Sequence, residues 1–124
     1  MEHGEEHGFR FQKLVIWQRS ADLAINLDEV ADQLEERRKY RFAEQLRAAG
    51  LSISNNIAEG SGSNTTPDFR KFFFIARKSA FECASMLLIF QRRNYVTESL
   101  CDELVSELES VSRMIVSFSR SLKS

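Results

Sequence analysis

The sequence predicts an all-α protein, folded as an antiparallel up-down-up-down four-helix bundle. The chain has 124 residues, of which 43% are hydrophobic and 28% charged, enough for one compact domain. One proline and five glycines are too few for the many turns of a β protein. Apolar residues recur at alternating steps of three and four in four segments with short connections, and short connections make consecutive helices antiparallel.

The first eight residues are expected to stand apart from the fold. Residues 1–8 are polar and contain Gly4 and Gly8, so we expect a disordered tail followed by a single bundle domain over residues 9–124. His3 and His7 have the spacing of metal ligands on a helix, but the glycines disfavour a helix here. We therefore expect no metal site.

The first helix is predicted over residues 11–38. Its apolar face consists of Ile16, Leu23, Leu27, Val30 and Leu34. The cations of residues 37–39 suit the negative end of the helix dipole, so we expect the helix to end there and a turn to follow at residues 40–41.

The second helix is predicted from Phe42 to the stop at residues 60–62. Gly60 is interpreted as a left-handed helix stop, a conformation that glycine adopts without strain. Gly50 lies inside the helix, where glycine costs about 1 kcal/mol relative to alanine. A close contact with another helix would explain its presence.

The third and fourth helices have clear start signals. Thr66 is predicted as the cap of the third helix, with Pro67 in its first position, and Asn94 as a left-handed stop after about residue 93. Thr97 is predicted to cap the fourth helix. The apolar row of that helix is Cys101, Leu104, Leu108, Val111, Ile115, Phe118 and Leu122.

The third helix carries two apolar rows. The predicted core row is Phe69, Phe73, Ala76, Ala80, Cys83, Leu87 and Phe90, and the second row, repeating every seven residues, is Phe74, Phe81, Leu88 and Tyr95. A helix at the corner of a bundle needs an apolar stripe of only about 100°, so we expect the second row to form an oligomer interface. The alternative is an irregular bundle in which this helix is more central.

The same helix is the basic part of a chain whose formal net charge is −1. Residues 67–94 contain two acids and six cations, namely Arg70, Lys71, Arg77, Lys78, Arg92 and Arg93. Cations at repeated spacing can bind phosphates, so this face is the candidate site for RNA or DNA. The alternative is an ordinary solvated helix face.

Other functional classes lack the residues that they need. We find no combination typical of a catalytic triad, a Walker loop or a di-metal bundle site, and expect neither enzyme activity nor a cofactor nor a small-molecule substrate. Without a signal peptide or an apolar run that could span a bilayer, a cytoplasmic protein is expected. Cys83 and Cys101, offset by about 10 Å along adjacent helices, are predicted to be free thiols.

Several motifs resemble a bacterial protein family. They are Ile16-Trp17-Gln18, Gln45-Leu46-Arg47-Ala48-Ala49, Ser52-Ile53, Asn56-Ile57-Ala58-Glu59-Gly60-Ser61-Gly62 and Phe72-Phe73-Phe74-Ile75-Ala76-Arg77-Lys78-Ser79. They are similar to motifs of the four-helix proteins encoded in intervening sequences of 23S ribosomal RNA genes, also called S23 ribosomal proteins. The resemblance implies a homopentamer. It also implies kinship with the accessory variability proteins of diversity-generating retroelements, which are pentameric and bind nucleic acid and a reverse transcriptase.

The signature residues and one departure bear on function. Asn56 and Glu59 share a helix face and are interpreted as structural residues that hydrogen-bond nearby backbone, the alternative being a ligand site. Ser63 stands where arginine commonly follows the signature of the family, which weakens a nucleic-acid role for that loop.

Two hypotheses follow from the sequence. The first is a non-enzymatic homo-oligomer that binds RNA or DNA without sequence specificity through the third helix. The second is a structural or protein-interaction module, for example an accessory of a polymerase or reverse transcriptase, without nucleic-acid binding of its own.

Overall fold

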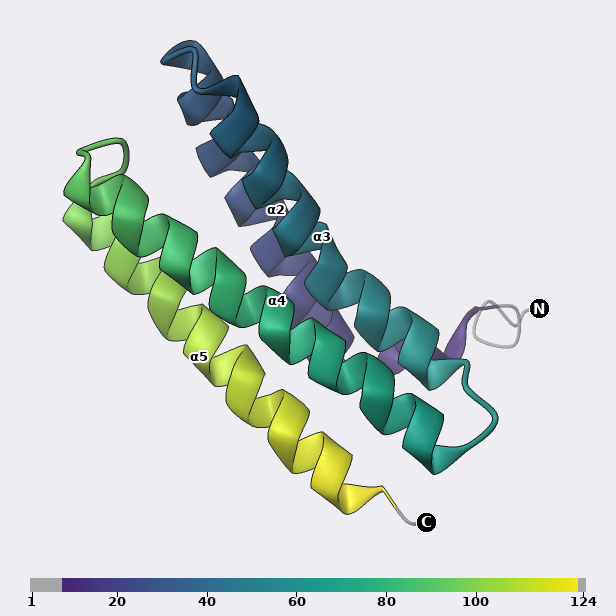
Figure 1. Cartoon of the computed structure of the whole chain (residues 1–124). Helices are drawn as coiled ribbons and strands as arrows, with labels where there is room; N and C mark the ends of the chain where they lie inside the picture. The colour runs from purple at the N-terminus through teal and green to yellow at the C-terminus, as the bar shows by residue number, and fades with distance from the viewer. Residues whose placement is uncertain (1–7, 123–124) are drawn as a thin grey trace.

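The computed structural model describes residues 8–122 and confirms an all-α bundle (Figure 1). Within these residues the chain forms a short 3-10 helix and four α-helices, and successive α-helices run in opposite directions. The elements are η1 (Arg10–Lys13), α2 (Val15–Glu36), α3 (Tyr40–Ser61), α4 (Thr66–Arg92) and α5 (Glu98–Ser121).

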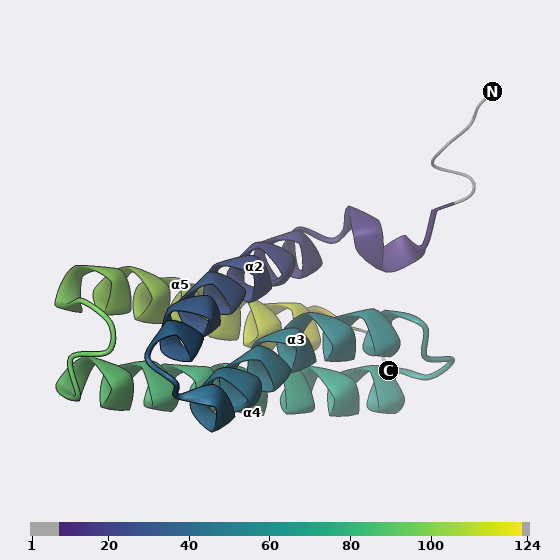
Figure 2. The ribbon, with the colours of Figure 1, turned by 90° about the horizontal axis from the view of Figure 1, so that it is seen from above.

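The helices pack as two pairs. Figure 2 shows α2 and α3 inclined to α4 and α5. Helix α3 contacts both α2 and α4 extensively, whereas α5 packs mainly on α4 and touches α2 much less. Because α5 has one principal neighbour, the other helices among residues 8–122 leave the outer side of the α4–α5 pair uncovered.

The predicted core rows are buried. All seven residues of the core row of α4 are buried, and the ring centroid of Phe73 lies 5.2 Å from that of Phe118 of α5. In α5 the row from Cys101 to Ile115 is buried, and Phe118 and Leu122 pack half-buried against the same core. The sequence periodicity therefore identified the inward faces of both helices.

The first helix and the turn after it differ from the prediction. Phe11 belongs to η1, and an extended Leu14 (φ −80°, ψ 122°) separates η1 from α2. The turn after α2 lies at residues 37–39 and α3 already begins at Tyr40, so the predicted turn at residues 40–41 is wrong. Arg38 makes this turn with a left-handed φ of 63°, and a non-glycine residue gives no sequence signal for it.

The caps of α4 and α5 mostly agree with the prediction. The cap of α4 is Thr65 and not Thr66, since the Asp68 amide donates to the Thr65 hydroxyl at 3.3 Å. Thr97 caps α5, accepting from the Leu100 amide at 3.2 Å, and Asn94 adopts the left-handed conformation with φ 61°, both as predicted.

Gly60 is not a left-handed helix stop. It lies inside α3, and none of the glycines that the structure describes has a positive φ. A Cβ on Gly60 would lie 3.1 Å from Phe69 Cδ1, 3.1 Å from Phe72 Cβ and 3.2 Å from the Phe69 carbonyl oxygen. Gly60 is thus required because the start of α4 passes directly over it. Gly50 has the predicted close contact, since a Cβ added to it would lie 3.0 Å from Leu27 Cδ1.

The predicted tail and its histidines, His3 and His7, fall outside the described residues apart from Gly8. Among the helices of residues 8–122, none combines the length and the apolar character needed to cross a membrane.

Candidate functional site

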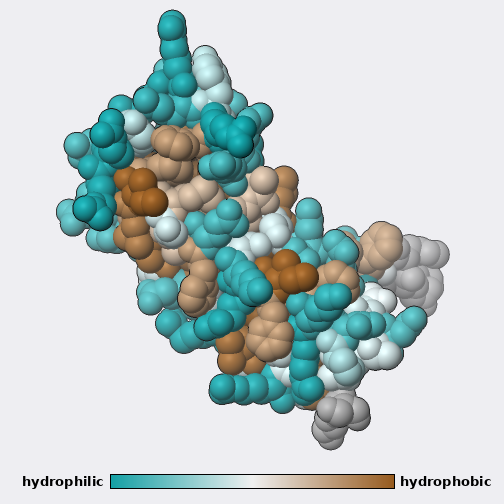
Figure 3. All heavy atoms as spheres, in the orientation of Figure 1, coloured by the Kyte–Doolittle hydropathy of each residue, from teal (hydrophilic) through white to brown (hydrophobic). Residues whose placement is uncertain are grey.

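The second apolar row of α4 is exposed over three of its four predicted members. Phe74, Phe81 and Leu88 are 56%, 55% and 49% exposed, and we call these three residues the exposed row. In Figure 3 apolar patches alternate with hydrophilic ones across the part of the surface that α4 forms in Figure 1. An apolar surface of this kind on a small protein is typical of a binding face.

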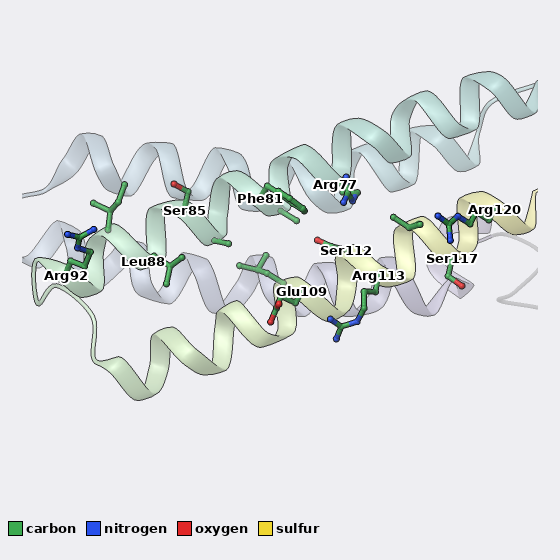
Figure 4. A pocket seen from close by; sticks show the side chains of 15 residues that line it. Arg77, Phe81, Ser85, Leu88, Arg92, Glu109, Ser112, Arg113, Ser117 and Arg120 are labelled. Carbon is green, nitrogen blue, oxygen red and sulfur yellow. The ribbon is translucent and has the colours of Figure 1, made fainter.

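A groove of about 880 Å³ runs between α4 and α5, beside the exposed row (Figure 4). Its apolar lining includes Ala84, Phe81 and Leu88 from α4 and Leu108 and Val116 from α5. We call this feature the α4–α5 groove.

Arginines from both helices flank the α4–α5 groove. Arg77 and Arg92 come from α4 and Arg113 and Arg120 from α5, whereas Glu109 is the one carboxylate among the lining residues. The Arg77 guanidinium carbon lies 4.6 Å from the centroid of the Phe81 ring, a cation–π distance. The excess of positive charge favours an anionic ligand.

Lys71 and Lys78 lie beyond the exposed row. They line a second hollow of about 540 Å³ together with Phe74, and both lysines are exposed, whereas Arg77 is half-buried. Around the axis of α4, Lys71 and Lys78 lie on one side of Phe74 and Phe81, and Arg77 lies on the other side. The exposed row therefore separates these lysines from Arg77. Apolar and cationic side chains are therefore interleaved on one face.

Arg70 has a different role from the other predicted phosphate ligands. Its Nε donates to the Ser119 carbonyl at 3.2 Å and its Nη2 to the Leu122 carbonyl at 2.7 Å. These carbonyls belong to the end of α5, where helical partners run out. Arg70 thus ties α5 to α4 and is less available to a ligand than Arg77.

Tyr95 is not part of the exposed row. Helix α4 ends at Arg92, and the left-handed Asn94 turns the chain back so that the Tyr95 amide donates to the Phe90 carbonyl at 2.8 Å. The half-buried Tyr95 ring lies at the end of the bundle, with the Arg93 guanidinium carbon 5.7 Å from its centroid. The prediction that Tyr95 continues the row is wrong because residues seven apart share a face only while the helix continues, and α4 ends before Tyr95.

The signature residue Asn56 makes hydrogen bonds to nearby groups of its own helix. Its Nδ2 donates to the Ser52 carbonyl at 2.8 Å and to the Ser52 hydroxyl at 3.0 Å. The Ser79 hydroxyl of α4 donates to the same Ser52 oxygen at 2.7 Å, so the network joins α3 to α4. Glu59 is exposed near the end of α3, one turn from Asn56.

Sequence reasoning missed Arg113 and Arg120. The fourth helix contains more acids than bases, which concealed them, although their spacing of seven residues indicates a common face. The structure separates the charges by face: Glu107 pairs with Arg19 of α2, whereas Arg113 and Arg120 line the groove towards α4.

The described residues contain no group suited to metal or thiolate chemistry. Within residues 8–122 there is no cluster of three or more potential metal ligands. Cys83 and Cys101 are buried free thiols, as predicted. Burial, and to a smaller extent the charge of Glu82, raises the pKa of the Cys83 thiol to about 12, so it stays protonated at neutral pH.

Comparison with known proteins agrees with this architecture. A solved structure of a protein of unknown function from the S23 ribosomal protein family of Bacteroides thetaiotaomicron has a TM-score of 0.82. The two chains are 22% identical, and the similarity covers 86% of this chain and 100% of the other. At this identity the similarity shows the fold alone. None of the curated proteins matches this chain. The model of the 23S rRNA-intervening sequence protein family matches residues 12–117, and the chain therefore belongs to this family.

Proposed function

We propose that this protein is a non-enzymatic nucleic-acid-binding protein that uses the face formed by α4 and α5. The observation that carries the proposal is the set of four arginines, from two helices, around the α4–α5 groove. Lys71 and Lys78 extend the positive face beyond the exposed row. The family name connects its members with 23S ribosomal RNA genes, but a gene location does not by itself establish RNA binding.

Binding without sequence specificity fits these side chains. Arginine and lysine on an open helical face reach phosphate oxygens, which are the same at every nucleotide. Such binding weakens steeply with salt because each phosphate contact releases a counterion. We therefore expect RNA and DNA of different sequences to bind with similar affinity.

The test is a salt titration of binding to a labelled single-stranded RNA. Charge reversal at Arg77→Glu and Lys78→Glu should weaken binding and reduce the slope of log K against log salt by about 0.7 for each phosphate that is no longer neutralised. The matched control is Arg10→Glu with Lys13→Glu, which makes the same charge change on η1. Affinity that is absent at low salt, or equal losses in both double variants, would contradict the proposed face. Absent affinity would favour the protein-interaction module.

The second candidate function is assembly, and the exposed row favours it. Phe74, Phe81 and Leu88 are about half exposed, and the resemblance to the S23 proteins implies a homopentamer. A second copy would cover the apolar residues, which typically form the centre of an interface, and leave the flanking cations at its polar rim. The two functions are compatible in that arrangement.

Sedimentation at micromolar concentration tests assembly. We expect a mass several times that of the 14.3 kDa chain and a shift to smaller species for Phe81→Asp, which buries a charge in an apolar contact. Ile25→Asp is the matched control, because Ile25 is 60% exposed on α2, away from the exposed row. A monomeric parent protein would refute assembly.

A further inference from the structure

The end of the bundle opposite the start of α2 brings together two short turns. One turn, residues 37–39, joins α2 to α3, and the other, residues 93–97, joins α4 to α5 (Figure 1). Each turn contains one residue with a left-handed φ, Arg38 at 63° and Asn94 at 61°. The two turns are distant in sequence, so their proximity is a property of the fold.

Tyr95, in the second turn, packs against aromatic side chains of α3 and α4. Its ring centroid lies 6.5 Å from that of Phe42 on α3 and 6.4 Å from that of Phe90 on α4. Phe42 and Phe90 are themselves 5.3 Å apart. This small aromatic cluster fixes the phenol at the surface of the bundle end.

Cationic side chains from both turns lie close to the Tyr95 ring. Lys39 Nζ lies 5.3 Å from the ring centroid, and the guanidinium carbons of Arg37 and Arg93 each lie 5.7 Å from it. Hydrogen bonding of the phenol with Arg93, and then with Lys39, lowers the pKa of Tyr95. We call Arg37, Lys39, Arg93 and Tyr95 the Tyr95 cluster.

Within residues 8–122, no ion pair joins a carboxylate to Arg37, Lys39 or Arg93 of the Tyr95 cluster. Among the residues that the structure describes, ion pairs join Arg19 to Glu107 and Arg47 to its three acidic partners on α2. Glu35, the partner of Arg47 closest to the turn, is thus already engaged. Three like charges held around one ring repel one another, and a bound oxyanion would relieve this repulsion.

We propose that the Tyr95 cluster is a binding site for a phosphate group. Arg37, Lys39 and Arg93 would supply charged N–H donors, and the protonated phenol of Tyr95 a further donor, to the oxygens of one phosphate. The site is separate from the α4–α5 groove, because none of the four residues of the Tyr95 cluster is among the residues that line that groove. It does not depend on the function proposed for the groove.

Calorimetric titration with inorganic phosphate tests the site directly. Lys39→Gln and Arg93→Gln should each weaken phosphate binding by about tenfold, the size expected for one charge-assisted contact at a partly exposed site. Tyr95→Phe keeps the ring and should weaken binding less. The matched control is Arg41→Gln, which removes one charge from the first turn of α3 without touching the Tyr95 cluster.

The source of the phosphate is distinguished by a second titration. An oligonucleotide with a 5′-phosphate that binds more tightly than its 5′-hydroxyl form, with the difference lost in Arg93→Gln, would identify a nucleic-acid end as the ligand. Equal binding of both forms, with inorganic phosphate still bound, would identify a free phosphate compound. The proposal is overturned if inorganic phosphate does not bind the folded protein, or if Arg41→Gln weakens it as much as Arg93→Gln does.

Discussion

Replacing Gly60 by alanine should destabilise the bundle by about 1 kcal/mol. The added Cβ would lie 3.1 Å from Phe72 Cβ and 3.2 Å from the Phe69 carbonyl oxygen, whereas carbon atoms pack best at about 3.5–4.0 Å. Both contacted atoms belong to or adjoin the backbone of α4, so no side-chain rotation relieves them. Overpacking of this kind costs about 1–3 kcal/mol, and the helix preference of alanine returns about 1 kcal/mol.

The assay is thermal and urea unfolding followed by far-UV circular dichroism. A loss of about 1 kcal/mol should lower Tm by about 4 °C in a chain of this length. Gly62→Ala is the control, because its Cβ would meet only the Glu59 carbonyl oxygen, at 3.6 Å, and should be nearly neutral. Gly50→Ala should be intermediate, since its closest contact is the flexible end of Leu27. A Gly60→Ala protein as stable as the parent would refute the close-packing explanation.

Three further outcomes are expected. Arg47 lowers the pKa of Glu35 from its ordinary value of 4.5, so this pair stabilises the fold above that pH and the stabilisation is lost as the pH falls below it. Arg47→Gln should therefore flatten the acid limb of a stability–pH profile measured by urea unfolding, and an unchanged limb would contradict the linkage. Cys83 should resist thiol reagents in the native protein and react on unfolding, because its pKa is raised to about 12; rapid native labelling would show that the site opens. Arg70→Gln should accelerate amide exchange at the end of α5 while weakening RNA binding less than Arg77→Gln does, and the reverse order would assign Arg70 to the ligand face.

The core of the bundle was predictable because it follows from local periodicity. Every residue of the row from Phe69 to Phe90 is buried, and the same spacing led correctly from Cys101 to Ile115 in α5. The cap at Thr97 and the stop at Asn94 were also predicted, since both depend on a few adjacent residues. The turn at Arg38 was not, because arginine has no preference for the left-handed conformation that it adopts there.

The candidate site was only partly predictable. Arg77, Lys78 and the exposed row were identified from α4 alone, but Arg113 and Arg120 reach the same face from a helix whose overall charge is negative. Arg70 lies seven residues before Arg77 and was predicted to bind phosphate with it, yet its guanidinium donates to carbonyls at the end of α5. Residue type and spacing indicate which side of a helix carries charge, not what lies opposite.

By itself, the sequence determined the helical class, the number of helices and the inward face of α4 and α5, because each depends on side chains one or two turns apart. The tertiary structure alone decided that α4 passes over Gly60, that four arginines surround one groove and that two turns place three cations on Tyr95. The groove depends on the packing of α5 on α4, whereas the contact at Gly60 and the approach of the two turns depend on how α2 and α3 are inclined to α4 and α5. No local pattern encodes that inclination.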